Sequence, residues 1–310
     1  MAAADRLLPA GRDVPFADIE VTLARLVRDG RDRKGAPARA LTATVIVIGD
    51  LARLAAAAEA LERLGESGGV RTILISEGEH TAPTARVTES AIAIAGLAPR
   101  FLNNAVAALR LSSLPAVVWW RGGSVDKLHD LAGLADRMIL DAEDPVEGWR
   151  KAQHLFERTA LTDLRWTRLT RWRSAVAHLF DLPPVRAGLG GFRRLTIEAA
   201  DPHAARLYAG WLRACLKWTP SVAIDIAPAP ANGARTPLRY VRLEGTGVAI
   251  TAAGKTSECL TAAVDGFEES ARIVPVGDAT LAALIGEELG VRTRDLAFER
   301  ALASALELEG

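Results

Sequence analysis

Residues 41–49, with the sequence LTATVIVIG, decide how the fold is interpreted. The run is nearly continuous in apolar residues and rich in β-branched ones, which favour strands. A strand with one wet face alternates polar and apolar residues, whereas a strand buried on both faces does not. The run therefore predicts a central strand of a parallel sheet that is covered by helices on both sides.

The segments around this strand extend the same pattern. An amphipathic helix is predicted over 16–29 and an alanine-rich helix over about 51–64. Further strand-like runs are predicted at 70–76, 90–96, 115–120 and 136–142, with a polar loop between the first two. They alternate with helical segments near 100–110, 124–133 and from about 145. Strands and helices that alternate in this way predict an α/β fold with a mostly parallel, doubly wound sheet.

A second domain is expected after the segment 182–191, LPPVRAGLGG, which concentrates proline and glycine. The first domain then comprises 1–189 and ends in a long helical stretch over 161–181. The second comprises 190–310, and its short strands with glycine- or asparagine-containing turns predict antiparallel hairpins. With two closing helices, near 278–289 and 294–307, it is expected to be a smaller α+β domain.

Composition restricts the classes of partner. The 38 basic and 38 acidic residues cancel, so the overall charge indicates neither nucleic acid nor an anionic membrane. The first residues do not resemble a secretory signal, and no apolar run approaches the roughly 20 residues of a spanning helix. Two cysteines, Cys215 and Cys259, do not make a disulfide framework, although their pairing stays open. A cytoplasmic protein is expected.

Three short motifs resemble catalytic ones but fail in context. The G-x-S-x-G pattern at 65–69 follows a helix and precedes a strand, the reverse of a nucleophile elbow. The segment 252–257, AAGKTS, lacks the first P-loop glycine because Ala249 stands there. The first strand is followed by a single glycine, Gly49, whereas the dinucleotide-binding fingerprint has three glycines there.

Titratable residues do not form a recognisable centre either. The five histidines have no metal-ligand spacing, and the cysteines have no Cys-x-x-Cys partner. Asp136, Asp141 and Asp144 lie around one strand beside Arg137, where pairing or capping is expected rather than acid–base work. The sequence therefore predicts no catalytic residue, no cofactor and no metal.

Two tryptophans, Trp119 and Trp120, end the strand 115–120. Neighbouring side chains of a strand point to opposite faces, so in a covered sheet each ring is expected to be buried beneath a different helix. Arg121, Gly122 and Gly123 follow at the carboxyl edge, before a helix that Ser124 could cap. An anion could be held there by backbone N–H groups and one guanidinium.

The segment 163–173, DLRWTRLTRWR, combines arginine and tryptophan. On a helix, Arg165, Arg168 and Arg171 form a basic stripe beside a broad apolar face that includes Trp172. Two interpretations stay open: a solvated cationic face over a packed one, or a docking surface, since both residue types are enriched in binding hot spots.

Several segments together resemble one family. LPAVVWWRG, LADRMILDA and DLRWTRLTRWRSAVAHLFD, in this order, with LIGEELGVRTRDLAFERAL near the end, are similar to the glucose-6-phosphate dehydrogenase assembly protein family, OpcA. The resemblance implies a protein that is not an enzyme. It implies that the chain binds glucose-6-phosphate dehydrogenase, the NADP-dependent entry enzyme of the oxidative pentose phosphate pathway, and promotes its assembled, active form as an allosteric effector.

The expected contact residues for that partner come from the tryptophan pair with the residues that follow it and from the segment 163–173. They are Trp119, Trp120, Arg121, Gly122, Arg165, Trp166, Arg168, Trp172 and Arg173. The alternative is a sensor or enzyme that binds a phosphosugar or nucleotide at the carboxyl edge of the parallel sheet, where α/β folds place ligands.

Overall fold

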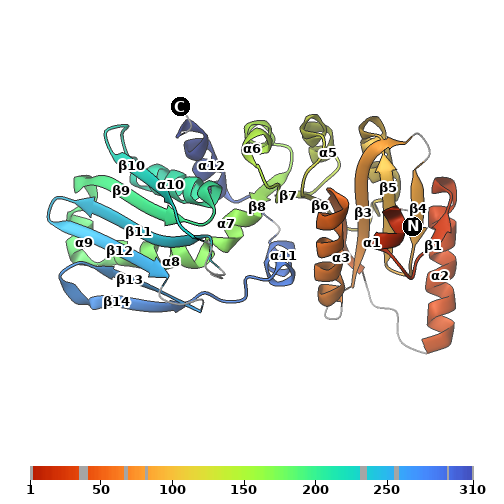
Figure 1. Cartoon of the computed structure of the whole chain (residues 1–310), viewed down its shortest axis with the longest axis horizontal. Coiled ribbons are helices and arrows are strands. Elements are labelled where there is room, and N and C mark those ends of the chain that lie inside the picture. Colours follow the sequence, from red (N-terminus) through yellow and green to blue (C-terminus); the bar gives the residue numbers. More distant parts are fainter. Residues whose placement is uncertain are drawn as a thin grey trace. The chain divides into compact units, whose positions relative to one another are not determined.

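The computed structural model describes residues 3–34, 41–65, 69–80, 83–230, 236–254, 258–291 and 293–308 (Figure 1). The chain forms two compact units. Unit 1 comprises Met1–Thr162 and Thr280–Arg294, and unit 2 comprises Asp163–Ala279 and Asp295–Gly310. This division differs from the expected boundary at 189/190, because the segment after Thr162 packs with the second sheet. It also separates the two closing helices, which were both expected in the second domain.

Unit 1 is built on an eight-stranded sheet with the order β1-β4-β5-β3-β2-β6-β7-β8. Strands β3, β2, β6 and their neighbours β5 and β7 pair in parallel. From β2 the chain first adds strands on one side and then crosses to β6 on the other. The strands are β1 (Arg12–Val14), β2 (Leu41–Ile48), β3 (Gly69–His80), β4 (Thr84–Val87), β5 (Ala91–Leu97), β6 (Ala116–Trp120), β7 (Arg137–Leu140) and β8 (Ala160–Asp163).

The order β5-β3-β2-β6-β7-β8 is that of dinucleotide-binding sheets, with the topological switch point between β2 and β6. The core of the sheet is apolar as expected, since the last six residues of β2 and all five of β6 are buried. The switch point at the carboxyl edge is where folds of this strand order bind their ligands.

Most helices of unit 1 form two groups, and α2 contacts β4 instead. Helix α3 contacts α1 and α11, and α5 contacts α4 and α6. These helices are α1 (Ala3–Leu7), α2 (Ile19–Lys34), α3 (Leu51–Gly65), α4 (Leu102–Leu109), α5 (Leu128–Ala132), α6 (Val146–Ala152) and α11 (Leu281–Gly290), with 3-10 turns η1 (Phe16–Asp18), η2 (Pro99–Phe101) and η3 (Val125–Lys127). Chain 280–294 joins unit 1 through α11 and through the buried ion pair of Arg137 with Glu288.

The polar loop expected after residue 76 is partly strand. β3 continues to His80, and β4 turns back to pair antiparallel with β5. Ala85 and Val87 of β4 are buried, and β1 then pairs with its outer edge. A short alternation of polar and apolar residues thus gives an edge hairpin, which a pattern of long apolar runs does not predict.

Unit 2 contains a six-stranded sheet with the order β10-β9-β11-β12-β13-β14. All pairs are antiparallel except β10 with β9. The strands are β9 (Phe192–Ala199), β10 (Ala223–Pro228), β11 (Leu238–Gly245), β12 (Val248–Gly254), β13 (Cys259–Val264) and β14 (Phe267–Pro275). The predicted fold class, a mostly parallel α/β sheet followed by an α+β part with antiparallel strands, is confirmed.

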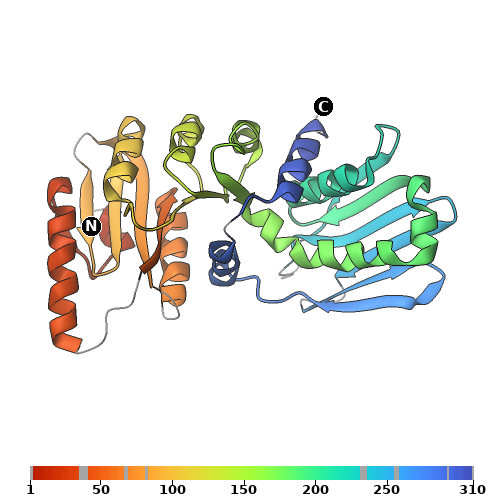
Figure 2. The ribbon, with the colours of Figure 1, turned by 180° about the vertical axis from the view of Figure 1, so that it is seen from behind.

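The helices of unit 2 cover one face of this sheet. Helix α8 contacts β12, β13 and β14, and α10 contacts β9 and β10. Figure 2 shows these helices in front of the strands. They are α7 (Leu164–Arg168), α8 (Thr170–Ala177), α9 (Pro183–Ala187), α10 (Pro202–Leu216) and α12 (Leu296–Glu307), with 3-10 turns η4 (His178–Asp181) and η5 (Leu189–Gly191).

The long helix expected over 161–181 is wrong in its first part. Residues 160–163 form the buried strand β8, and helix α7 begins only after Asp163. Asp163 ends the strand and caps the helix, since its carboxylate accepts the Arg165 N–H at 2.8 Å. A second helix, α8, follows at Thr170.

Helices α10 and α12 approach most closely at Gly210. A methyl group at this position would clash with the Ala301 carbonyl oxygen and lie 2.7 Å from the Ala305 nitrogen. Because both atoms belong to backbone, relief needs the helices to separate.

We predict that Gly210→Ala lowers the free energy of unfolding by about 1–3 kcal/mol, the usual cost of overpacking. Urea unfolding measures it. The matched control is Gly190→Ala, because a methyl group there meets nothing within 4 Å. Equal stabilities of the two variants would contradict the close approach.

Candidate functional site

The two adjacent tryptophans are both buried. Trp119 is 0% exposed and Trp120 is 3% exposed, as the covered strand predicts. Trp120 packs against Gly148 of α6, where an added methyl group would come within 2.9 Å of the indole ring. The Trp119 ring instead has the Arg121 guanidinium 4.8 Å from its centroid. Neither ring lies on the accessible surface.

Arg121 closes the carboxyl edge at the switch point. Its Nε donates to Asp141 at 2.9 Å, and both side chains are nearly buried. One terminal nitrogen donates to the Arg53 carbonyl at 2.6 Å, and Arg53 in turn donates to the Arg121 carbonyl at 2.8 Å. Arg53 also pairs with Glu143 at 2.5 Å. The ends of β6 and β7 and the start of α3 are thereby tied together.

The turn from β2 into α3 does not suit a dinucleotide. Dinucleotide folds hold the pyrophosphate at the N-terminus of this helix, next to a glycine-rich turn. Here the Asp50 carboxylate accepts the Arg53 N–H at 2.9 Å, so a negative charge already lies at that terminus. Gly49 is followed by Leu51 and Leu54 where the fingerprint has its other glycines. The residues present do not fit an NADP group.

The loop after β6 is likewise engaged by the chain itself. Gly122 and Gly123 have φ of 143° and 114°, which favours glycine. They bring the N–H and hydroxyl of Ser124 to Glu77, whose carboxylate accepts both at 2.8 and 2.9 Å. The anion expected beside Ser124 thus has a counterpart within the protein, the carboxylate of Glu77 on β3.

From this geometry we predict that neither NADP nor glucose 6-phosphate binds the isolated protein. A ligand that binds only the folded state raises the melting temperature in proportion to RT ln(1 + [L]/Kd). Calorimetry and thermal melts at millimolar ligand should therefore show no heat of binding and no shift. A saturable response to either ligand would contradict the prediction and would favour the phosphosugar or nucleotide alternative.

The arginine–tryptophan segment forms a second cluster, in unit 2. Arg165 is 7% exposed and is therefore not part of a solvated stripe. Its Nε donates to Asp201 at 2.9 Å, and one terminal nitrogen lies 3.7 Å from the buried Asp163 carboxylate. Asp201 also caps α10 by accepting the N–H groups of His203 and Ala204. Arg165 consequently fixes the N-terminus of α10 against α7.

Trp166 makes the corresponding link to α12. Its indole Nε1 donates to Asp295 at 2.7 Å, and Asp295 caps α12 by accepting the N–H groups of Ala297 and Phe298. The Trp166 ring lies 5.8 Å from the Phe298 ring, and the Arg173 guanidinium stacks 3.5 Å from its centroid. One five-residue helix, α7, thus holds the N-termini of two longer helices.

The nine predicted contact residues therefore differ in accessibility. Six are buried: Trp119, Trp120, Arg121, Arg165, Trp166 and Trp172. Gly122, Arg168 and Arg173 are half-buried, and Arg171 between them is exposed. The structure brings Arg165, Trp166 and Arg173 together around α7, and groups Trp119, Arg121 and Gly122 at the edge of the first sheet. The assignment of all nine to partner contact stays a prediction.

The cysteines and the possible metal ligands are dispersed. Cys215 and Cys259 are free thiols, and partial burial raises the pKa of Cys215 despite the nearby charges of Arg300 and Arg173. Within the described ranges no three His, Cys, Asp or Glu side chains gather as metal ligands would. Ser67 and Lys255, from the G-x-S-x-G and AAGKTS motifs, lie outside the described residues. Among the helices that are described, none combines the length and apolarity that a membrane span requires.

Asp295 has two roles that one substitution removes. We predict that Asp295→Ala lowers the free energy of unfolding by about 1–2 kcal/mol, because α12 loses its cap and Trp166 loses its acceptor. Trp166→Phe removes only the second interaction. In a double-mutant cycle by urea unfolding the two changes should couple by about 0.5 kcal/mol or more. Strict additivity would show that the indole bond contributes nothing.

Comparison with known proteins bears on the same segment. Residues 159–302 match the family described as the C-terminal domain of a glucose-6-phosphate dehydrogenase subunit, and this range begins just before α7. This part of the chain is similar to the OpcA proteins. The resemblance found in the sequence is confirmed.

Curated relatives match over a similar length. The OxPP cycle protein OpcA of Nostoc punctiforme is 30% identical over 128 residues, which are 38% of this chain and 28% of that protein. The OpcA of Synechococcus elongatus is 34% identical over 124 residues, 37% of this chain and 28% of that protein. The match thus spans little more than a quarter of the relatives' length.

Among solved structures, the transcriptional regulator Gal80p of Kluyveromyces lactis aligns with a TM-score of 0.48 at 7% identity. The alignment covers 90% of this chain and 93% of Gal80p.

Three important carboxylates were not singled out from the sequence. Asp201, Asp295 and Glu77 each accept hydrogen bonds that fix a helix or a loop. Asp201 carries a signal that could have identified it, because an aspartate before proline at the start of an apolar periodic run is typical of a helix N-terminus. Glu77 has no such signal, since its partner Ser124 is distant in the sequence.

Proposed function

We propose that this chain is a non-catalytic, cytoplasmic assembly factor that binds glucose-6-phosphate dehydrogenase and favours its assembled, active form. The observation that carries the proposal is the match of residues 159–302 to the family of dehydrogenase-associated domains. That range contains helix α7, with Arg165 and Trp166, and most of unit 2. The names of the relatives, which refer to the oxidative pentose phosphate cycle, support the same pathway.

The carboxyl edge of unit 1 supports a role without chemistry. Arg121 and Arg53 fill the switch point, Asp50 caps the helix that would face a pyrophosphate, and Glu77 engages the loop after β6. Each of these groups would have to leave its partner before a dinucleotide could enter. These internal contacts favour a structural role for the unit over nucleotide binding.

An assembly factor of this kind acts by selective binding. It must bind the assembled dehydrogenase more tightly than the separated protomers, because equal affinity for both would shift nothing. A tenfold preference corresponds to about 1.4 kcal/mol of coupling. Within the predicted set, the buried residues serve this function indirectly, by holding strand ends and helices in place, whereas Arg168, Arg173 and Gly122 are accessible enough to touch the partner.

We expect that adding this protein to the dehydrogenase raises its activity and increases its mass in light scattering. Both should saturate at a defined ratio of the two proteins. If no complex forms and the kinetics stay unchanged, the proposed function is wrong.

Arg168→Glu tests the accessible part of the contact set. Charge reversal at this half-buried position should weaken the complex at least tenfold while leaving the fold intact, as measured by titration and circular dichroism. The matched control is Arg186→Glu on α9, an exposed arginine outside the contact set. Equal weakening by both variants would show a general charge effect and would remove Arg168 from the contact surface.

A further inference from the structure

Strand β14 forms one of the two outer edges of the six-stranded sheet in unit 2. It pairs with β13 on its inner side, and within the described residues no strand pairs with its outer side. With nine residues it is longer than β10 at the opposite edge, which has six and ends at Pro228. A long unpaired edge is the kind of backbone to which another strand can be added.

The hydrogen-bond pattern shows which backbone groups of β14 face outward. The Val276 N–H donates to the Glu258 carbonyl, at the start of the pairing with β13. In an antiparallel pair, residues that bond to the partner strand alternate with residues that do not. Counting back from Val276, Val274 and Arg272 face β13. Ile273 lies between them, so its N–H and carbonyl point to the outer edge, and the residue is 72% exposed.

A hollow lies beside this edge, between β14 and the 3-10 turn η4. Its volume is about 460 Å³, and it is lined by His178, Leu179, Asp181, Leu182, Ser270 and Arg272. Among the described residues, neither Asp181 nor Arg272 has an ion-pair partner. A segment added to β14 directs alternate side chains to the η4 side of the sheet, where they meet Ser270 and Arg272. The edge thus combines free backbone groups, which give affinity to an added strand, with a pocket that selects one of its side chains.

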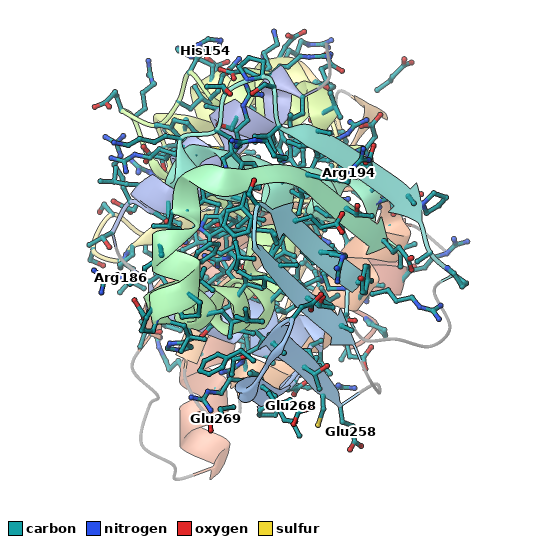
Figure 3. All side chains as sticks on the ribbon, turned by 90° about the vertical axis from the view of Figure 1, so that its left-hand side faces the viewer. His154, Arg186, Arg194, Glu258, Glu268 and Glu269 are labelled. Atoms are coloured by element: carbon teal, nitrogen blue, oxygen red, sulfur yellow. The ribbon has the colours of Figure 1, made fainter. Side chains whose placement is uncertain are left out.

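The carboxylates of β14 are available to a partner. Glu268 and Glu269 are exposed, and within the part of the chain that the structure describes their side chains make neither an ion pair nor a hydrogen bond. Figure 3 shows both at the lower edge of the unit, apart from Arg186 of α9 and Arg194 of β9. No arginine of the unit neutralises them within the described residues.

This charge selects among possible occupants of the edge. β14 contains two glutamates and one arginine, so negative charge is in excess. The β14 edge of a second copy would bring the same excess, which disfavours pairing between two copies. A segment with lysine or arginine opposite Glu268 and Glu269 is attracted instead. The glutamates therefore keep the edge from pairing with strands in general and admit a basic one.

We propose that an extended, basic segment of glucose-6-phosphate dehydrogenase adds as a strand to the outer edge of β14, with lysine or arginine opposite Glu268 and Glu269 and one side chain in the hollow beside η4. The proposal rests on the proposed function and gives it a contact surface. The range 159–302, which matches the family of dehydrogenase-associated domains, includes both η4 and β14.

Ile273→Pro and Ile273→Ala form a matched pair that tests the strand addition. Both remove the exposed side chain, but only proline removes the outward N–H, and an edge strand tolerates proline where that N–H faces solvent. Titration of the dehydrogenase should show binding about tenfold weaker or more for Ile273→Pro, and binding like that of the wild type for Ile273→Ala. In hydrogen–deuterium exchange, the dehydrogenase should slow exchange over 267–275 of the wild-type chain.

Charge reversal tests the chemistry of the added segment. The double variant Glu268→Lys with Glu269→Lys should weaken the complex by about tenfold, since two attractions become repulsions. The matched control is Glu59→Lys with Glu62→Lys, which reverses two exposed carboxylates on α3 and should leave binding unchanged. Circular dichroism establishes that each variant is folded.

Three outcomes would overturn the strand addition while the proposed function stands, because in each of them the wild-type chain binds the dehydrogenase. Ile273→Pro could bind like the wild type, or Ile273→Ala could bind as weakly as Ile273→Pro, which would assign the effect to the side chain. In the third outcome the double variant of Glu268 and Glu269 binds like the wild type. If the wild-type chain itself does not bind, the proposed function is wrong, and this proposal with it.

Discussion

The buried contact of Arg121 with Asp141 is the interaction on which the first unit depends. Two charges this far from water need further hydrogen bonds, and the Arg53 carbonyl accepts one from the same guanidinium. If one partner were removed, the other would remain as an uncompensated buried charge, at a cost of about 3–5 kcal/mol. The contact therefore fixes the strand ends at the switch point and occupies the place where folds of this order receive a ligand.

In the second unit, too, carboxylates hold neighbouring elements together. Asp163, Asp201 and Asp295 each cap a helix, and α7 uses Arg165 and Trp166 to bind the latter two. Arg165 and Trp166 thus donate hydrogen bonds to carboxylates that already cap helices. The arginines and tryptophans that resemble a binding surface in the sequence largely hold helices together inside the unit.

The sequence predicts the fold well where a run of residues is continuously buried, and poorly where the contacting residues are far apart in the chain. The apolar run 41–48 and the pair Trp119–Trp120 correctly predicted a covered parallel sheet, because strand alternation alone determines which faces they occupy. Arg165 was placed on a basic surface stripe, either solvated or docking, because helical spacing does not reveal a partner 36 residues away, Asp201. Glu77 and Ser124 meet only through the strand order. Pairing between strands and helices far apart in the chain is the information that local patterns lack.

Hydrogen–deuterium exchange tests the central claim most directly, that the chain supports a partner and receives no ligand of its own. The chain is measured alone, with NADP, and with glucose-6-phosphate dehydrogenase. Our account predicts that the dehydrogenase slows exchange in the accessible part of the α7–α8 segment, 164–177, and that NADP alone changes nothing. Slower exchange at 49–54 and 121–124 with NADP alone, and none with the dehydrogenase, would contradict it.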